Sequence, residues 1–201
     1  MFELAAFMAP LVAGIAVPGA LAWTAGRPPS RRAIVAGAAT GALLAIVALA
    51  SIGHPVRQLG PVLAITLSVA MLSAAVALLA EAAGGRPAVA QLCGGLAVCA
   101  LYASVVLFGP MLDHAATAEL DGPAVGRRVT LLLELNPLST AAIDVFRDDL
   151  YHRPVFYALD FASYQHEPPR WTSAVGRYAL LTAVVGALAA GVFVLRRRLA
   201  G

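Results

Sequence analysis

The chain has 201 residues, 60% of them hydrophobic and only 12% charged, and its mean hydropathy is +0.82. This composition excludes an ordinary soluble domain and indicates a membrane protein. The formal net charge is +3, but the arginines cluster at the ends of apolar runs, so we expect no nucleic-acid partner.

Five apolar stretches are long enough to cross a hydrocarbon core, which needs roughly 20 helical residues. We therefore predict an all-α polytopic membrane protein that forms a single transmembrane domain over residues 1–201 and contacts the lipid bilayer. The long connection before the last stretch, residues 110–172, is expected outside the membrane. The five spans are predicted at about residues 4–23, 33–52, 61–80, 88–109 and 178–195.

The first two spans contain residues with specific effects on helix geometry and packing. Pro10 and Pro18 interrupt the first span, and each removes a backbone hydrogen bond. We expect a static bend there, with a hinge as the alternative. In the second span, Gly37 and Gly41 form a GxxxG pair, which permits close contact between helices. We expect this pair to pack within the bundle, with dimerisation as the alternative.

No predicted span has an ionisable residue near its middle, since Glu3, Glu81 and Arg177 lie at or beyond span ends. Proton relays and ion-coupled carriers keep such residues within the membrane, where each costs at least about 2.5 kcal/mol. The chain is therefore not expected to act by itself as a pump or an ion-coupled transporter. It also lacks paired intramembrane carboxylates and Cys-His clusters, which argues against an intramembrane enzyme.

The long connection is the soluble-looking part of the chain, with nine of the eleven Asp and Glu residues and five Arg. His114, His152 and His166 share it with several carboxylates, but their spacings match no compact ligand motif, so we expect no metal. The sequence contains no Walker, GxSxG or HExxH motif. We accordingly expect no enzymatic activity and no cofactor.

Within this connection, the stretch LELNPLSTAAIDVFRDDLY predicts a short amphipathic helix. Asn136 is a good helix N-cap, and Pro137 suits the first helical position, where no amide donor is needed. Leu138, Val145 and Phe146 belong to an apolar face with helical spacing. We expect the helix to lie along a surface, with this face toward the bundle or the lipid and the opposite face toward water. The residues expected on the water-facing side are Ser139, Thr140, Asp144, Arg147 and Asp148.

The arginines indicate how the chain is oriented, because cytoplasmic loops carry the Lys/Arg excess. Residues 27–32, Arg86 and residues 196–198 supply arginines on one side, whereas the short loop on the other side has only Arg57. We predict an external N-terminus and a cytoplasmic C-terminus. The lack of Lys and the excess of Ala and Gly indicate a GC-rich bacterial genome, so the expected location is the bacterial plasma (inner) membrane.

Three stretches resemble ABC-2-type transporter permeases, the membrane subunits of ABC exporters. GRPPSRRAIVAGAATGALLAIV, residues 26–47, is similar to the cytoplasmic turn that precedes a long apolar helix in that family. LNPLSTAAIDVF, Trp171 and the tail LRRRLAG are similar to the family's external short helices and its last span. Such permeases have six spans with both termini inside, so five spans from outside to inside would correspond to the second through sixth.

The resemblance implies a function and partners for specific residues. The cytoplasmic turn would contact a partner ATPase of the ABC type, although plain orientation by positive charge explains the same arginines equally well. The external helix would form a lid over the external mouth. A second permease subunit, in a homo- or heterodimer, would be a further partner. The residues implied are Arg27, Pro29, Ser30, Arg31 and Arg32 in the turn and Asn136, Pro137, Leu138, Val145 and Phe146 in the lid.

The sequence thus leaves two functions open. The first is a transmembrane permease subunit of an ATP-driven exporter, energised by a separate chain. The second is a non-transporting multi-pass membrane scaffold whose acidic external segment binds a partner.

Overall fold

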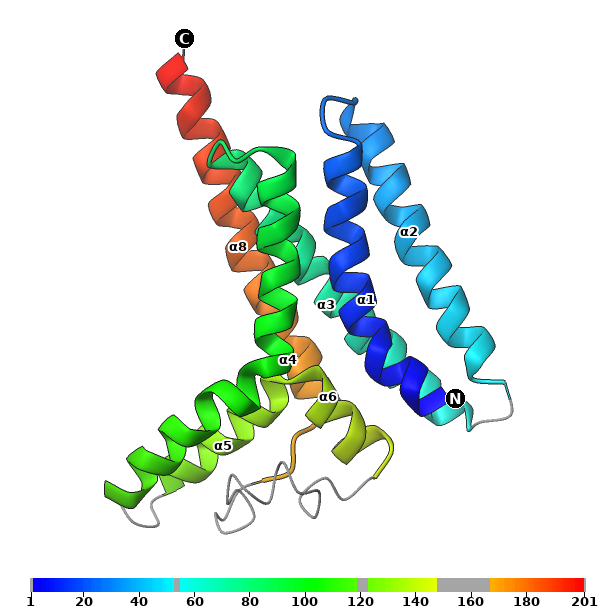
Figure 1. Ribbon diagram of the computed structural model, residues 1–201, viewed down its shortest axis with the longest axis vertical. Helices are drawn as coiled ribbons and strands as arrows, with labels where there is room; N and C mark the ends of the chain where they lie inside the picture. Colours follow the sequence, from blue (N-terminus) through cyan, green and yellow to red (C-terminus); the bar gives the residue numbers. More distant parts are fainter. Residues whose placement is uncertain (1, 53–54, 119–122, 148–166, 201) are drawn as a thin grey trace.

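The structure, a computed structural model, describes residues 2–52, 55–118, 123–147 and 167–200. All elements in these ranges are helical, and five of the helices are long and apolar enough to cross a membrane. The predicted all-α, multi-pass fold is thereby confirmed. Figure 1 shows the helices α1 (Phe2–Trp23), α2 (Pro29–Ala50), α3 (Val56–Ala82), α4 (Pro87–Ala118), α5 (Pro123–Leu135), α6 (Pro137–Thr140), the π-helix η1 (Ala141–Val145) and α8 (Trp171–Ala200).

The long helices run alternately up and down between two ends of the bundle (Figure 1). The C-terminal end of α8 and the connections α1–α2 and α3–α4 lie at one end, which we call the arginine end because its arginines are those of residues 27–32, Arg86 and residues 196–198. The start of α1 lies at the opposite end, together with α5 and α6. The two ends of the chain are therefore on opposite sides of the bundle.

Two spans extend beyond their predicted bounds. α4 continues to Ala118 instead of ending near residue 109, and α8 begins at Trp171 instead of near residue 178. Figure 1 shows that α4 bends away from the bundle axis in its last part, which contains Pro110. A proline in a helix interior removes a backbone hydrogen bond and favours such a bend. α5 runs back alongside this part of α4 (Figure 1).

The centre of the bundle is α3, which packs against α1, α4 and α8. In the most apolar part of α3, half of the residues are buried inside the bundle, whereas only 6% are buried in the corresponding part of α2. Its buried face is formed by branched apolar side chains that recur three to four positions apart, the spacing of one helix face. This face consists of Val62, Ile65, Val69 and Leu72.

α1, α3 and α4 approach most closely around one serine. The hydroxyl of Ser73 on α3 lies within hydrogen-bond reach of the carbonyls of Gly14 on α1 and Gly94 on α4. A Cβ atom at Gly94 would lie 2.7 Å from Cγ of Pro18 and 2.9 Å from the carbonyl oxygen of Ser73. Only glycine fits there without displacing a neighbouring backbone, so residue 94 sets the distance between these helices. α1 itself continues unbroken through Pro10 and Pro18, both of which are buried.

The GxxxG pair on α2 does not pack within the bundle, so that expectation is wrong. Gly37 and Gly41 are exposed, and a Cβ atom on either would meet nothing within 4 Å. The helix instead contacts its neighbours through larger side chains, including Leu43 and Val47. Branched side chains make more dispersion contacts with neighbouring helices than glycine can, which favours turning that face inward.

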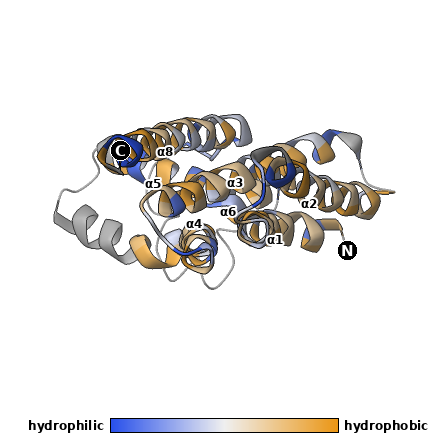
Figure 2. Cartoon of the chain, turned by 90° about the horizontal axis from the view of Figure 1, so that it is seen from above, coloured by the Kyte–Doolittle hydropathy of each residue, from blue (hydrophilic) through white to orange (hydrophobic). Residues whose placement is uncertain are grey.

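The outside of the bundle is apolar over most of its length. Large hydrophobic side chains are exposed on all five long helices, as expected for a protein whose surroundings are lipid. Figure 2 shows hydrophobic residues covering the long helices, with hydrophilic ones concentrated at the connections and at the C-terminal end. Examples of the exposed apolar residues are Leu4, Ile46, Met71, Leu96 and Leu188.

Candidate functional site

The stretch LELNPLSTAAIDVF, singled out by the sequence, begins with a capped turn. Asn136 follows α5 in an extended conformation, and its side-chain oxygen accepts a hydrogen bond from the amide of Ser139 at 3.0 Å. Pro137 occupies the start of α6, so the predicted N-cap is confirmed. The side-chain amide of Asn136 also donates to the carbonyl of Tyr102 on α4 at 2.8 Å. One buried side chain therefore starts a helix and fixes it to a membrane span.

The helix that follows is shorter and more buried than predicted. It ends as η1 at Val145, and Arg147 adopts a left-handed conformation with φ of 58°. Ser139 and Thr140, expected to face water, are both fully buried. The hydroxyl of Thr140 donates to the carbonyl of Leu133 at 3.2 Å, which satisfies one of these polar groups without water. The expectation that Ser139 and Thr140 face water is therefore wrong, whereas Arg147 is exposed as expected. The predicted continuation to Asp148 and beyond lies outside the described residues.

The end of this helix packs onto α1. Val145 is buried in the main core cluster, and the ring of Phe146 makes edge-on contacts with those of Phe2 and Phe7, at 5.6 and 5.4 Å between centroids. Such pairs stabilise by about 0.5–1.5 kcal/mol beyond their area burial. Both residues face the bundle, as the sequence predicts, whereas Leu138 is only partly buried.

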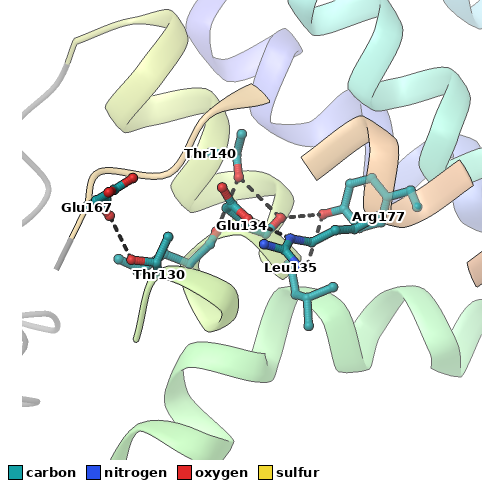
Figure 3. A network of polar contacts seen from close by, with 8 residues as sticks. Thr130, Glu134, Leu135, Thr140, Glu167 and Arg177 are labelled. Carbon is teal, nitrogen blue, oxygen red and sulfur yellow. Dashed lines mark hydrogen bonds and ion pairs between the residues drawn. The ribbon is translucent and has the colours of Figure 1, made fainter. Parts of the chain in front are cut away.

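An ion pair absent from the sequence-based predictions joins α5 to α8. Glu134 is 3% exposed, and its Oε2 atom lies 2.6 Å from Nε of Arg177. The hydroxyl of Tyr178 donates to the carbonyl of Leu135 at 3.0 Å beside it. Figure 3 shows this network, in which the hydroxyl of Thr130 also donates to the carbonyl of Glu167 at 2.9 Å. The sequence signal was a single acidic residue in the apolar run LLLEL, which needs a partner once buried.

A second carboxylate from this stretch caps the last span. Oδ2 of Asp144 accepts a hydrogen bond from the amide of Trp171 at 2.8 Å, at the first residue of α8. A negative charge at a helix N-terminus satisfies a free amide and interacts favourably with the helix dipole. This contact explains why α8 begins earlier than hydropathy predicts.

At the arginine end, the three arginines at the α1–α2 connection differ in exposure and pairing. Arg27 and Arg31 are exposed, whereas Arg32 forms a bidentate ion pair with Glu81 at the end of α3. Its two terminal nitrogens lie 3.0 and 2.5 Å from the carboxylate oxygens. Pro29 begins α2, and the side chains of Pro29 and Ser30 lie outside the described part of the structure.

The same end contains a pocket that sequence reasoning missed. A cavity of about 530 Å³ opens between α2, α3 and α8. Its polar lining includes the ion pair just described, and Nη1 of Arg196 donates to the carbonyl of Ala82 at 3.1 Å. The guanidinium of Arg197 lies 4.4 Å from the centroid of the Phe193 ring. The cavity lies where the basic end of α8 runs beside the end of α3, with the Arg196 side chain reaching Ala82, a contact that local patterns do not encode.

In the described ranges, no three His, Cys, Asp or Glu residues lie close enough to hold a metal ion. The histidines that suggested a metal are not described there: His152 and His166 lie in the segment left out, and the side chain of His114 is likewise outside the described part. The expectation on a metal thus remains a prediction.

Comparison with protein-family models, with curated proteins and with solved structures found no match to this chain. The resemblance to ABC-2-type permeases therefore depends on the motifs and topology of the chain itself.

Proposed function

We propose that the chain is the transmembrane permease subunit of an ATP-driven exporter of the ABC type, energised by an ATPase on a separate chain. It lies in the bacterial inner membrane with its N-terminus outside and its C-terminus in the cytoplasm. The main observation in support is the Arg32–Glu81 ion pair, because it connects the turn where an ATPase would bind to the central helix α3.

In this proposal the arginine end receives the motion of the ATPase. Arg27 and Arg31 are exposed and available to an acidic surface on the partner, while Arg32 is already held by Glu81. A displacement of the turn pulls on the end of α3 through two charge-assisted hydrogen bonds, which are strong and directional. Since α3 packs against α1, α4 and α8, the displacement reaches most of the bundle.

The external end provides the lid. α6 and η1 close against α1 through Phe146, while the Glu134–Arg177 pair holds the preceding helix to α8. Release of substrate to the outside then requires the aromatic contacts of Phe146 to separate. These contacts are apolar and few, so they can reopen, whereas the buried ion pair remains as the fixed attachment.

A second permease subunit completes the proposed assembly. Gly37 and Gly41, with Ala33 and Ala45, form a row of small exposed residues on α2. Small residues at such spacing let two helix backbones approach closely in lipid. Replacing both glycines with Leu should abolish cross-linking between copies in membranes, while Gly60→Leu, at another open glycine, should leave it intact. Unchanged cross-linking would place the subunit contact elsewhere.

Site-specific cross-linking tests the ATPase contact. With Cys93 and Cys99 replaced by Ala, a single cysteine at Arg27 or Arg31 is treated with a short bifunctional reagent in native membranes. The adducts are then identified by mass spectrometry. We expect an ATPase with Walker motifs. Arg57→Cys, an exposed arginine at the opposite end, is the matched control and should give no such adduct.

The same experiment separates the permease from the scaffold. Adducts with an external protein only, or no ATPase adduct from either cytoplasmic position, would contradict the permease and favour a membrane scaffold with an acidic external segment.

A further inference from the structure

The pocket at the arginine end has the chemistry of a lipid-binding site. Three guanidinium groups line it, those of Arg32, Arg196 and Arg197, against the single carboxylate of Glu81. Two positive charges therefore remain without a balancing carboxylate in the lining. Within the described residues, Arg196 donates to a backbone carbonyl and Arg197 lies over an aromatic ring, and neither is paired with an acid.

The exposed donors of the pocket are the guanidinium groups of Arg196 and Arg197. Arg32 is already occupied, because both of its terminal nitrogens are bound to Glu81 and its Nε atom is buried. Phosphate oxygens suit Arg196 and Arg197, because guanidinium groups bind them in a planar, forked geometry.

The rest of the lining is apolar. Leu78 and Phe193, with three alanines, form walls that continue along α3 and α8 into the membrane-spanning parts of both helices. A charged mouth above apolar walls fits a molecule with an anionic head and a hydrocarbon chain. Basic pockets between membrane helices on the cytoplasmic side bind anionic lipid head groups in this way.

We propose that this pocket binds an anionic phospholipid, with its phosphodiester on Arg196 and Arg197 and an acyl chain against Phe193. The lipid would bridge α3 and α8 at the membrane surface. The inference does not depend on the permease function, since it rests on the charge and shape of the pocket alone.

Native mass spectrometry of the purified full chain tests the proposal. The protein is titrated in detergent with phosphatidylglycerol or with phosphatidylcholine of the same acyl chains. We expect phosphatidylglycerol to be retained preferentially. The double variant Arg196→Gln, Arg197→Gln should weaken its binding by roughly thirtyfold, given a contribution of about 1 kcal/mol from each basic residue near an anionic lipid surface. Equal retention of the two lipids would overturn the proposal.

Two controls make the result specific. Arg198→Gln removes the same charge from the same tail at a position that does not line the pocket, so it should leave binding unchanged. An equal loss with this variant would show nonspecific attraction to the tail and overturn the proposal. Competition with inorganic phosphate distinguishes a lipid from a free anion. Full displacement at millimolar phosphate would mean that the acyl chain contributes nothing, which also contradicts the proposal.

A third variant covers the case in which the arginine changes disturb folding. Ala190→Phe fills the pocket from its wall without changing any charge. It should reduce phosphatidylglycerol retention to the level of phosphatidylcholine while leaving the thermal midpoint of the protein unchanged. If the filled pocket retains the lipid as well as the original chain does, the lipid binds elsewhere and the proposal fails.

Discussion

Glu134 and Arg177 are 43 positions apart in the sequence, yet their side chains meet with 2.6 Å between Oε2 and Nε at the junction of α5 and α8. The carboxylate is almost completely buried, while the arginine side chain is 44% exposed. Removing Arg177 therefore leaves the buried carboxylate of Glu134 without a partner. Removing the carboxylate leaves the Arg177 guanidinium, which can still contact solvent. The two single substitutions are therefore not equivalent.

The first prediction follows from that asymmetry. Arg177→Gln should destabilise the chain by about 3 kcal/mol, the low end of the range for breaking a buried pair, because part of its charge is already solvated. Glu134→Gln should cost less, and the double variant should show that the effects are not additive. The measurement is thermal unfolding in detergent. Glu167→Gln is the control, because within the described residues this exposed residue takes part in the network through its backbone carbonyl. Equal losses from both single variants would argue against the asymmetry.

The cap on α8 gives a second prediction. Asp144→Ala should lower the free energy of unfolding by about 1 kcal/mol. It should also speed hydrogen exchange at the amides of the first turn of α8, since the Trp171 amide loses its acceptor. Asp144→Asn should retain part of the effect because an amide oxygen still accepts. Arg147→Ala should change little, because its exposed contact to Asp144 is 3.7 Å long. Unchanged exchange in Asp144→Ala would show that the helix start is fixed in another way.

A third prediction concerns the two environments of glycine. Gly94→Ala should destabilise the bundle by about 1–3 kcal/mol, because its Cβ atom would press on the backbone of Ser73 and the ring of Pro18. Gly191→Ala, in the interior of α8, should instead be neutral or stabilising by up to about 1 kcal/mol, since it gains helix propensity in open space. Thermal midpoints in detergent compare them directly. A similar loss for both would contradict the assigned packing.

The proposed coupling gives a fourth prediction. Arg32→Glu should lower the ATPase activity that depends on the permease several-fold, while Arg27 and Arg31 still retain the ATPase on purification. The double variant Arg32→Glu, Glu81→Arg restores opposite charges and should recover most of the activity, because the ion pair can form in reverse. Recovery by the double variant is the decisive readout. If it stays as inactive as the single variant, the pair does not transmit the motion.

Orientation in the membrane is the fifth prediction. A reporter fused to the N-terminus should be active outside the cytoplasm and one fused to the C-terminus inside, because the arginine end is expected to stay in the cytoplasm. Paired alkaline phosphatase and fluorescent protein fusions make the measurement. Both termini on one face would contradict an odd number of crossings.

The membrane-spanning helices could be predicted because length and apolar content are local properties, and five such stretches in the sequence became five long helices. The N-cap at Asn136 was predictable for the same reason. The burial of Thr140 was not, since it depends on a hydrogen bond to the turn before it and on cover from neighbouring helices. The outward-facing position of Gly37 on α2 could not be predicted either, because a row of small residues does not show which face a helix buries.

The Glu134–Arg177 pair and the arginine-end pocket were missed for a further reason. Each unites residues from helices distant in the sequence, and the pairing is decided by how α8 returns along α3 and α5. A single acidic residue within LLLEL shows that some partner is needed but not which one. The sequence shows that Glu134 needs a partner once it is buried, but only the fold shows that the partner is Arg177.

The serine at the centre of the bundle has a consequence for how the protein is made. Ser73 brings together backbone atoms of Gly14 and Gly94, so its full set of contacts exists only after α4 has been inserted. During synthesis α1 and α2 can pack against each other, but α1 lies in the bilayer without its contacts to α3 and α4 until those helices are inserted. Chains released by the ribosome before residue 94 should therefore be recognised by membrane proteases and degraded, whereas chains released after α4 should survive long enough to acquire their last span.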